Sequence, residues 1–530
     1  MSKPVRTRIA PSPTGDPHVG TAYIGLVNMV HARQNGGTFV FRLDDTDRSR
    51  YRADSEETLF RSLRWLGLDW DEGPDKGGDY GPYRQSERTE IYVEHVNRLL
   101  ESGHAYRCFC TPEEIDAHRA QLRAEKKTPR APRTWRDADP AAVKEQLAAG
   151  TPHVVRLRVP LEEDVTIHDL LRKDPITINT RELQDQVLLK ADGYPTYHLA
   201  SVVDDALFEI THIVRAEEWI SSAPIHKLLF DAFGYPMPVL CHMPLLRNAD
   251  KSKISKRKNP TSLLHYKEAG FLPEGLLNFL ALLGWGGPKT PDGGNQEIFS
   301  LDEMIEHFRL DNVSLGSPVF DQAKLRHVNA EHLRALTPEE FVARTQAYMF
   351  DKERMLALAP LLAPRVETLG EVCERADFVF GEIHHFTPET RKLKDKNLRT
   401  VIAGLQPAGV EPLDAHFALR EIREALEGLT EWTAETLEPT CRSLTNEDWV
   451  GWKAKTLFMA IRVAIAGKQE TPPLFETMAI LGKSRVLGRL DQAARALAEP
   501  GKKALKRWEK SKAERAGRRA ASAAEAAGET

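Results

Sequence analysis

The chain has 530 residues, 41% of them hydrophobic, and a formal net charge of −4. This length predicts several domains, and the slightly acidic balance excludes a strongly basic nucleic-acid binder but leaves room for a local basic patch. The five cysteines do not indicate a disulfide framework, and the sequence contains neither a signal-peptide core nor a run of about 18 apolar residues. We therefore expect a cytoplasmic protein without a transmembrane helix.

The N-terminal region predicts a strand–loop–helix–strand unit. Alternating residues over 5–10 indicate a short strand, apolar residues recur at helical spacing over 20–35, and residues 38–45 indicate a buried strand. Such a unit usually builds a parallel sheet, in which the first loop faces a helix N-terminus. That loop, PSPTGDPHVGT at residues 11–21, holds three prolines, two glycines and His18.

This proline-rich loop could seat a phosphate, because free N–H groups and the dipole at a helix N-terminus favour an anion. Its glycines permit close backbone approach, and its prolines fix its shape before a ligand arrives. The alternative is a stiff connector with a surface histidine, which the loop taken alone favours. The loop matches neither GxxxxGK[ST] nor GxGxxG, so a P-loop NTPase and a dinucleotide dehydrogenase are disfavoured.

The middle of the chain alternates between helical and strand-like patterns. Charged, helix-like residues at 111–150 precede a strand-rich block over 151–213, in which residues 185–205 alternate in the manner of strands. We interpret 111–150 as part of an insertion that splits a nucleotide-binding fold. After about residue 330 strand alternation nearly vanishes and helix-start signals recur, such as the capping box at 337–340, so we predict an all-helical last third.

The segment beyond Pro500 is rich in Lys, Arg and Ala and contains one tryptophan, Trp508. A solvated, frayed helix or tail is the favoured interpretation. One alternative is a sequence-independent contact with nucleic-acid phosphates. A membrane-surface helix is less favoured, because Trp508 stands almost alone among bulky apolar residues.

A second cluster of chemical interest is KSKISKRKNP at residues 251–260, of which five are Lys or Arg. The usual fate of such a run is a solvated surface. This run, however, follows an apolar strand-like piece at 243–246, so it is expected at a sheet edge. Lysines there would suit a polyphosphate leaving group.

Taken together, HVGT at His18–Thr21 and KISKR at Lys253–Arg257 resemble the two signatures of the class I aminoacyl-tRNA synthetases, usually written HIGH and KMSKS. Further blocks resemble the bacterial glutamyl-tRNA synthetases of this class, in order, over roughly residues 5–495. These blocks are RIAPSPTG, RLDDTD, GPYRQSER, DGYPTYHLASVVDD, RAEEWISSAPIH, HMPLLRN and VSLGSPVFD. Thr21 replaces the final histidine of HIGH, a position that these bacterial enzymes commonly relax.

The resemblance implies an α/β fold, in which a Rossmann-type parallel-sheet catalytic domain is split by an insertion and followed by an all-helical C-terminal anticodon-binding region. The implied domains are two Rossmann halves at 1–82 and 196–250, an inserted acceptor-end-binding domain at 83–195, a KMSKS-loop and stem-contact domain at 251–330, helical anticodon-binding subdomains at 331–390 and 391–499, and a basic tail at 500–530.

The resemblance also implies a reaction, a partner and a cofactor. A glutamate–tRNA ligase joins L-glutamate to ATP as glutamyl-adenylate and releases pyrophosphate. It then passes the glutamyl group to the 3′-terminal adenosine of tRNA(Glu) and releases AMP. In this family Mg²⁺ accompanies ATP, the first step needs bound tRNA, and the enzyme is a monomer.

The implied site residues fall into two sets. Glutamate would be bound by Arg8, Ala10, Ser12, Asp44, Tyr197, Arg215 and Trp219. ATP would be bound by His18, Gly20, Glu218, Leu246, Lys253, Ile254, Ser255, Lys256 and Arg257, with His18, Lys253 and Lys256 as catalytic residues. The chemistry agrees, because a guanidinium pairs with a carboxylate in a bidentate fork, which suits a dicarboxylic amino acid. Asp44 would hold the substrate ammonium, one methylene shorter than the family's usual Glu.

These residues have plainer alternatives. The acids within residues 44–47 could form a strand-end turn or a Mg²⁺ cluster. Arg8 and Arg215 could be ordinary surface-paired arginines, and Tyr197 and Trp219 could be simple core residues.

Two further predictions concern metal and anticodon. Some family members hold zinc in the insertion through a CxC pair and a second Cys/His pair. After Cys108 and Cys110, however, only His118 follows up to about residue 135, so we predict no structural zinc. Arg365 resembles the arginine that reads the third anticodon base in members that reject the glutamine tRNA, and a helix-surface salt-bridge partner is the alternative.

Two other functions stay open on the sequence alone. A small-molecule nucleotidylyltransferase also carries a histidine near a helix start, but it would not need about 200 helical residues after the catalytic fold. A non-catalytic tRNA-binding relative predicts decayed motifs, whereas His18, Lys253 and Lys256 are present. Glutaminyl-tRNA synthetases carry β-barrels where this chain predicts helices.

Overall fold

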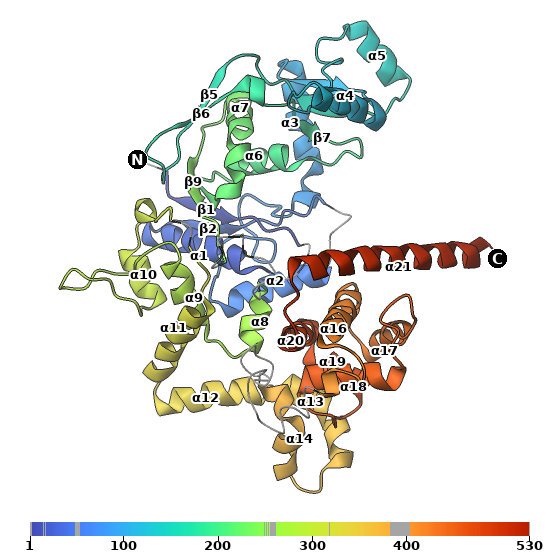
Figure 1. Ribbon diagram of the computed structural model, residues 1–530. Helices are drawn as coiled ribbons and strands as arrows, with labels where there is room; N and C mark the ends of the chain where they lie inside the picture. Colours follow the sequence, from blue (N-terminus) through green and yellow to red (C-terminus); the bar gives the residue numbers. More distant parts are fainter. Residues whose placement is uncertain are drawn as a thin grey trace. The chain divides into compact units, whose positions relative to one another are not determined.

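The computed structural model describes the chain from residue 3 to residue 528, with gaps at 14, 16, 48–52, 249, 251, 253, 255–260, 317 and 382–402. The chain divides into two compact units, drawn in Figure 1. The α/β unit comprises Met1–Leu263 and Leu272–Arg334, and the helical unit comprises Leu264–Phe271 and Ala335–Thr530. Among the described helices, none is long and apolar enough to cross a bilayer.

Two parallel strand pairs form the sheet layer of the α/β unit. Strand β1 (Arg6–Ile9) pairs with β2 (Thr38–Phe41), and β8 (His212–Ala216) pairs with β9 (Val239–Met243). The two pairs adjoin where Thr211 N donates to Arg6 O at 2.9 Å. Parallel pairing requires crossover connections, and most residues of these strands are buried, including the charged residues Arg6, Arg8 and Arg215. The predicted parallel α/β arrangement is confirmed.

Helix α1 (Val19–Gln34) is the first crossover, and it connects β1 to β2. Its N-cap is His18, whose Nδ1 accepts a hydrogen bond from Gly20 N at 2.9 Å. A Cβ added at Gly25 would lie only 2.9 Å from Ile9 Cδ1, so the helix packs closely on β1. The cap and this packing together hold His18 beside the carboxyl end of β1.

An antiparallel sheet lies in chain order between the two parallel pairs. Strands β3 (Ala105–Cys108), β4 (Val154–Leu157) and β7 (Val187–Leu189) form it in the order β3-β4-β7, and β5 (Asp164–Ile167) pairs with β6 (Ile176–Asn179) as a separate ribbon. This change from parallel to antiparallel pairing supports the predicted insertion. Its helices are α3 (Thr89–Glu101), α4 (Pro112–Ala124) and α5 (Pro140–Ala148).

The strand prediction over residues 185–205 is wrong in its second half. Tyr197–Leu207 forms helix α6. Its apolar residues Leu199, Val202 and Val203 follow a helical period, but the polar residues between them, such as Asp204, are buried as well. Because both kinds of residue are inside, the sequence carries no clear contrast between a buried and an exposed face.

The α/β unit is completed by helices that cover the sheet layer or follow it in sequence. They are α2 (Ala53–Trp65), α7 (Ala223–Phe233), α9 (Pro273–Leu282), α10 (Leu301–His307) and α11 (Gln322–Ala335). Helix α8 (Leu263–Glu268) begins at the boundary with the helical unit.

The helical unit contains no strand among its described residues, which confirms the predicted all-helical last third. Thr337 accepts from Glu340 N and forms the predicted capping box at the start of its first long helix. The helices are α12 (Pro338–Met349), α13 (Lys352–Leu362), α14 (Gly370–Phe380), α16 (Pro412–Glu427), α17 (Ala434–Ser443), α18 (Ala454–Ala466), α19 (Leu474–Leu481), α20 (Lys483–Leu497) and α21 (Lys502–Gly528).

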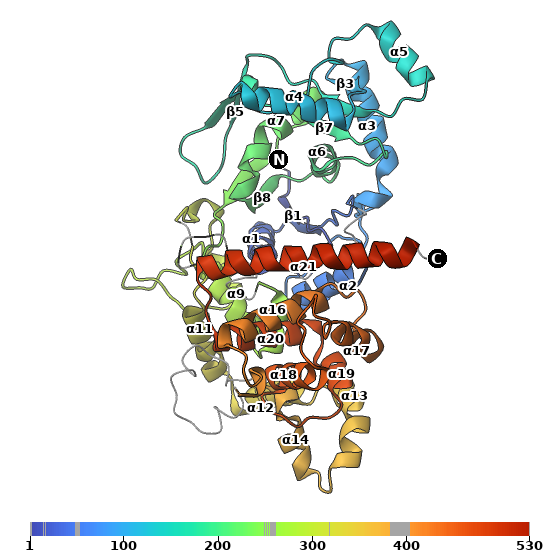
Figure 2. The same cartoon turned by 45° about the vertical axis from the view of Figure 1, so that its right-hand side comes forward.

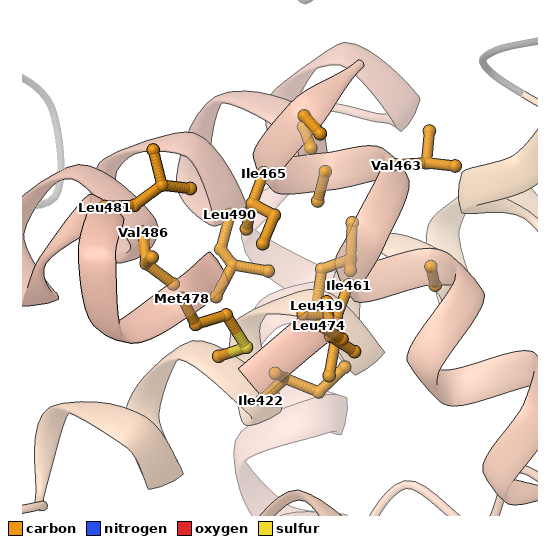
Figure 3. Close-up of a cluster of buried hydrophobic side chains, with 14 of the residues drawn as sticks. Leu419, Ile422, Ile461, Val463, Ile465, Leu474, Met478, Leu481, Val486 and Leu490 are labelled. Atoms are coloured by element: carbon orange, nitrogen blue, oxygen red, sulfur yellow. The ribbon is translucent and has the colours of Figure 1, made fainter. Parts of the chain in front are cut away.

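The core of the helical unit is built from aliphatic side chains. Figure 3 shows side chains from α16, α18, α19 and α20 gathered in one cluster. Ile422, Ile461 and Leu490 in this cluster have no exposed surface. Burying each such side chain contributes about 1.5–3 kcal/mol, so this cluster is the main source of stability in the unit.

The segment after Pro500 was predicted to be a solvated, frayed helix or tail; it is a helix, but one of its sides is docked. It forms the continuous helix α21, drawn in red in Figures 1 and 2. The ring of Trp508 stacks on Phe417 of α16, with centroids 5.0 Å apart and planes 9° apart. An aromatic stack of this kind docks the helix on the unit, which the sequence composition did not indicate.

Candidate functional site

A cavity of about 370 Å³ opens at the carboxyl ends of the parallel strands. It is bordered by the residues that follow β1, β2, β8 and β9, by the start of α1, and by the short 3₁₀ segment Glu217–Ser222. In open α/β sheets, ligands bind in this position, beyond the carboxyl ends of strands. The topology therefore brings residues that are far apart in sequence to one site.

Most of the predicted site residues that are described line this cavity. They are Arg8, Ala10, His18, Gly20, Asp44, Tyr197, Arg215, Glu218, Trp219, Leu246 and Ile254. Ser12 is exposed and is not among the lining residues. Lys253, Ser255, Lys256 and Arg257 lie outside the described residues.

Several lining residues were not predicted. They are Ile9, Pro11, Thr21, Tyr23, Ile24, Arg42, Val214, Ala216, Pro244 and Leu245. Most of them are direct chain neighbours of predicted residues. Arg42 is different, because a charged side chain inside the apolar strand-like run TFVFRL was a visible signal of a buried ionic role.

The guanidinium of Arg215 projects from β8 into this cavity and is held by neutral acceptors. Its Nη1 donates to Tyr197 Oη at 2.9 Å, and its Nη2 donates to the Trp219 carbonyl at 3.3 Å. The described residues provide no carboxylate within ion-pair distance of Arg215, and its side chain is buried. Burial lowers the pKa of Arg215, so the site holds a cation whose charge is poorly compensated.

The buried residue His242 orients the guanidinium of Arg215 through its Nε. Arg215 Nε donates to His242 Nε2 at 3.0 Å, and His242 Nδ1 lies 2.6 Å from Asp169 Oδ2. The acid fixes the tautomer, because a proton on Nδ1 leaves Nε2 as an acceptor. Burial lowers the pKa of His242 even though Asp169 acts in the opposite direction, which favours the neutral ring.

A second histidine pair completes the surroundings of Arg215. His226 Nδ1 lies 3.3 Å from Arg215 Nη1, and His226 Nε2 lies 3.4 Å from His198 Nδ1. Burial holds the pKa of His226 well below its usual range and lowers that of His198 to about 4. Neutral histidines add no positive charge, so they support the arginine without repelling it.

Arg42 joins two acids in the same cavity region. It binds Asp44 through two hydrogen bonds, Nε–Oδ1 at 2.7 Å and Nη2–Oδ2 at 3.1 Å, and its Nη1 donates to Asp205 Oδ1 at 2.7 Å. Burial raises the pKa of Asp44 to about 6, although Arg42 acts in the opposite direction. The Asp44 carboxylate is thus fixed in direction and close to its titration range.

Arg8 is part of the same network. Its Nε and Nη2 donate to the two oxygens of Asp205 at 3.0 and 3.3 Å. Both Arg8 and Arg215 are about 95% buried, with exposed fractions of 4% and 5%, so the alternative of surface-paired arginines is wrong. Unlike Arg215, Arg8 already has an acidic partner.

The aromatic residues of the site are not core residues. Tyr197 is half-buried and Trp219 is 38% exposed, and their ring centroids lie 4.4 Å apart. This pair forms one wall of the cavity next to Arg215. The alternative that they are simple core residues is therefore wrong.

The two acids that follow β2, Asp44 and Asp45, have different partners. Asp45 accepts from Ser86 N at 2.8 Å and from Ser86 Oγ at 2.6 Å, so it ties the residues after β2 to the short 3₁₀ segment Gln85–Glu87. Among the described residues, no group of three or more His, Cys, Asp or Glu side chains is arranged to hold a metal ion. The geometry thus separates Asp44, which lines the cavity, from Asp45, which holds the loop.

Backbone hydrogen bonds join the first signature segment to residues 261–263, which follow the second one in the chain. Val19 N donates to Thr261 O at 2.8 Å, and Leu263 N donates to Pro17 O at 2.9 Å. On the other side, Ile254 N donates to Leu246 O at 3.1 Å. Ile254 is therefore fixed beside Leu246, and residues 261–263, which follow the undescribed residues 255–260, are fixed beside the start of α1.

Arg365 lies in the helical unit at the end of the 3₁₀ segment Ala363–Arg365. Its Nη1 donates to the carbonyl of Leu361 at 2.7 Å, and its side chain is exposed. No ion pair of Arg365 occurs among the described side chains, so the alternative of a salt-bridge partner has no support.

Comparison with known proteins gives a consistent picture. The family model "tRNA synthetases class I (E and Q), catalytic domain" matches residues 4–327, and "Anticodon binding domain" matches residues 340–494. The chain is 45% identical over 512 residues to a "Glutamate--tRNA ligase" of Psychrobacter sp. (strain PRwf-1), covering 97% of each chain. It is 44% identical over 506 residues to that of Acinetobacter baylyi, covering 96% of each.

A solved structure agrees. A "glutamate tRNA ligase from Elizabethkingia meningosepticum" in complex with its amino acid is 30% identical, with a TM-score of 0.62, and the match covers 94% of this chain and all of that one.

Proposed function

Because the chain belongs to the class I tRNA synthetases of the glutamate and glutamine family, we propose that it is an enzyme that ligates L-glutamate to tRNA(Glu). Glutamate and ATP form glutamyl-adenylate with release of pyrophosphate. The glutamyl group then passes to the 3′-terminal adenosine of the tRNA with release of AMP. A nucleotidylyltransferase would leave the matched anticodon-binding region without a role.

The observation that carries the substrate assignment is the uncompensated charge of Arg215. A buried guanidinium held only by neutral acceptors is the natural partner of a carboxylate, which it can bind through two parallel hydrogen bonds. An amino acid with a neutral side chain offers only its α-carboxylate, which reacts with ATP, whereas the side-chain carboxylate of glutamate stays free to pair with this guanidinium. We therefore assign Arg215 to a carboxylate of glutamate, with Tyr197 and Trp219 as the adjoining wall.

Asp44 is proposed to receive the substrate ammonium. Its carboxylate is oriented by Arg42, and an ionised carboxylate has about four acceptor positions, so a third partner can be accommodated. Arg8, already paired with Asp205, sets the position of that acid and through it of Arg42. Ala10 completes this end of the cavity, and Ser12 stays a predicted contact outside the cavity lining.

ATP is proposed to lie across the start of α1 and the end of β9. His18 Nδ1 accepts from Gly20 N, so a neutral ring carries its proton on Nε2 and can donate to a phosphate oxygen. Glu218, Leu246 and Ile254 line the same region. Lys253, Ser255, Lys256 and Arg257 are proposed to act on the phosphates, with Lys256 stabilising the charge that develops as pyrophosphate leaves. Mg²⁺ enters with ATP as its counter-ion.

The helical unit is proposed to bind the anticodon, and Arg365 to read its third base. Arg365 is exposed at a segment end and has donors available, which fits the commonest side chain for reading base edges. This assignment predicts that the enzyme discriminates against the glutamine tRNA.

We also propose a cytoplasmic monomer without structural zinc. A structural zinc needs four ligands, and among the described residues no group of three or more His, Cys, Asp or Glu side chains that includes Cys108 and Cys110 is arranged to hold a metal ion. Metal analysis of the purified protein would contradict this proposal if it found one zinc per chain.

The test of the function is glutamate-dependent exchange of pyrophosphate into ATP, measured with and without tRNA. We expect exchange only when tRNA is present, and attachment of glutamate to tRNA(Glu) rather than tRNA(Gln). Exchange in the absence of any tRNA would count against the family mechanism. Lys256→Ala is expected to lower the exchange rate by about 10²-fold or more and to leave tRNA binding intact, and an unchanged rate would remove Lys256 from its role.

A further inference from the structure

Helix α21 has two chemically distinct sides, and one of them is docked on the helical unit. Successive helical residues turn by about 100°, so residues 508, 512, 515 and 519 fall within about 60° of the helix circumference. Trp508 of this side stacks on Phe417, and Arg420 of α16 lies 5.0 Å from its ring centroid. The docked side is therefore defined by an aromatic anchor.

The basic residues of the docked side have partners within the unit, and two of them, Lys512 and Arg515, pair with acids. Arg515 Nη2 donates to both oxygens of Glu421, at 2.8 and 2.7 Å, and Lys512 pairs with Glu424. Arg519 lies 3.6 Å from the ring centroid of Trp449. The docked cations thus already have their partners, and they account for only part of the positive charge of the helix.

The outward side carries the remaining charge. Lys502, Lys503, Lys506, Arg507 and Lys510 are exposed. These five positions fall within about 140° of the circumference, and the centre of that arc lies opposite the docked side. Lys510 is 3.9 Å from Glu514, and the described residues provide no ion pair for the other four. Glu509 is the one acid within residues 502–510.

The outward row has the opposite sign to the molecule as a whole, whose formal net charge is −4. Nine residues of helix extend over about 12 Å, so the row could face several consecutive phosphates. A lipid surface is a poorer match, because the outward positions carry no bulky apolar side chain and Trp508 is turned to the unit.

We propose that this outward row, defined by Lys502, Lys503, Lys506, Arg507 and Lys510, is a sequence-independent binding surface for the phosphate backbone of the tRNA substrate. The inference rests on the proposed function for the identity of the RNA. The docked side gives the row a fixed direction, so that binding does not require ordering of a loose tail. The surface adds affinity and association rate, and it takes no part in the chemical steps.

The decisive variant is K502Q/K503Q/K506Q/R507Q/K510Q, because Gln keeps helix propensity while it removes charge. We expect the KM for tRNA in aminoacylation to rise at least about tenfold, with kcat at saturating tRNA unchanged. The slope of log KM against log salt should decrease by about 0.7 for each phosphate that the variant no longer neutralises. The matched control K502R/K503R/K506R/K510R keeps the charge and should behave as the unmodified protein.

The variant W508A tests the role of docking separately. It removes the aromatic anchor while all five outward charges stay, and we expect faster hydrogen exchange in α21 and a smaller rise in the KM for tRNA. An unchanged KM and salt slope in the five-site Gln variant, with its circular dichroism intact, would show a merely solvated face and overturn the proposal. Loss of binding to vesicles of anionic lipid, with tRNA binding unchanged, would also overturn it.

Failure of the two proposals can be told apart. If the unmodified protein charges no tRNA with glutamate, the proposed function fails. The surface is tested independently by fluorescence anisotropy with labelled tRNA, which reports binding whether or not charging occurs. Equal anisotropy titrations for the unmodified and five-site Gln proteins would reject the surface even if glutamylation is normal.

Discussion

The surroundings of the cavity in the α/β unit and the main apolar cluster of the helical unit bury different kinds of side chain. Around the cavity of the α/β unit, Arg8, Arg42 and Asp205 are almost fully buried and bind one another. In the helical unit, the buried positions of the main cluster are filled by residues such as Ile461 and Leu490. Burial of apolar side chains stabilises the fold without fixing their orientation. A buried ionic network costs desolvation free energy, but its hydrogen bonds fix the orientation of each charged side chain. The ionic network around the cavity therefore costs stability but orients the charged side chains. The apolar cluster of the helical unit contributes stability.

Within the ionic network, one member stands out. Asp44 and Asp205 each bind an arginine, whereas the hydrogen-bond partners of Arg215 among the described residues are neutral. This difference predicts that substitutions at Arg215 alter ligand binding, whereas substitutions in the apolar cluster of the helical unit alter folding stability alone.

The largest expected effect comes from Arg215→Gln. Truncating one partner of a buried charge pair costs about 2–5 kcal/mol, so we expect kcat/KM for glutamate to fall about 10²–10³-fold. The measurement is tRNA-dependent pyrophosphate exchange over a range of glutamate concentrations. A decrease below about threefold would show that the carboxylate binds elsewhere. Circular dichroism of the variant should match that of the unmodified protein.

A smaller effect is expected when the support of Arg215 is removed by His242→Leu. A hydrogen bond to a charged group contributes about 1.5–3 kcal/mol, so the KM for glutamate should rise about tenfold or more while kcat changes little. His242→Gln can keep an acceptor near Arg215 Nε and should restore most of the affinity. Equal loss in both variants would mean that His242 acts through packing instead of through its acceptor nitrogen.

The pH dependence of glutamate use tests Asp44. Its pKa of about 6 means that the carboxylate loses its charge as pH falls through that value, so kcat/KM for glutamate should fall about tenfold per pH unit below it. The Asp44→Asn variant should show no inflection there. The contribution of Asp44 to folding stability changes with pH in the opposite direction to kcat/KM. Between pH of about 4 and 6 the folded chain binds more protons at Asp44 than the unfolded chain does, so this group lowers the free energy of unfolding as pH rises.

The smallest effect is expected in the apolar cluster. Ile461→Val removes one buried methylene and should lower the free energy of unfolding by about 0.5–1.5 kcal/mol in denaturant titrations. Its glutamate kinetics at 25 °C should equal those of the unmodified protein. A change in the KM for glutamate would mean that the two units are not as independent as their interiors indicate.

Much of this organisation could be predicted from the sequence, and the exceptions have physical causes. The strand at 5–10, the capping box at 337–340 and the helical last third rest on local signals that the structure confirms. The strand prediction over 197–205 was wrong because polar residues of α6 are buried for the network instead of being exposed.

The site shows the same limit. Arg215 and Asp44 could be identified through the resemblance, but their partners could not. His242, Asp169 and Arg42 are brought to the site by strand pairing and burial, which a single sequence does not encode at any fixed spacing. The docking of α21 was missed for the same reason, because the acids that hold it lie on α16.

The hydrogen bonds that join the start of α1 to the residues that follow the second signature are made by backbone atoms on both sides, at Pro17, Val19, Thr261 and Leu263. Such bonds do not depend on the identity of the side chains. The two signatures lie about 235 residues apart in the chain. Side chains in either region can therefore change during evolution while these backbone hydrogen bonds stay in place. The threonine at position 21 is a change of this kind, because it alters a side chain near these hydrogen bonds without altering the backbone atoms that form them.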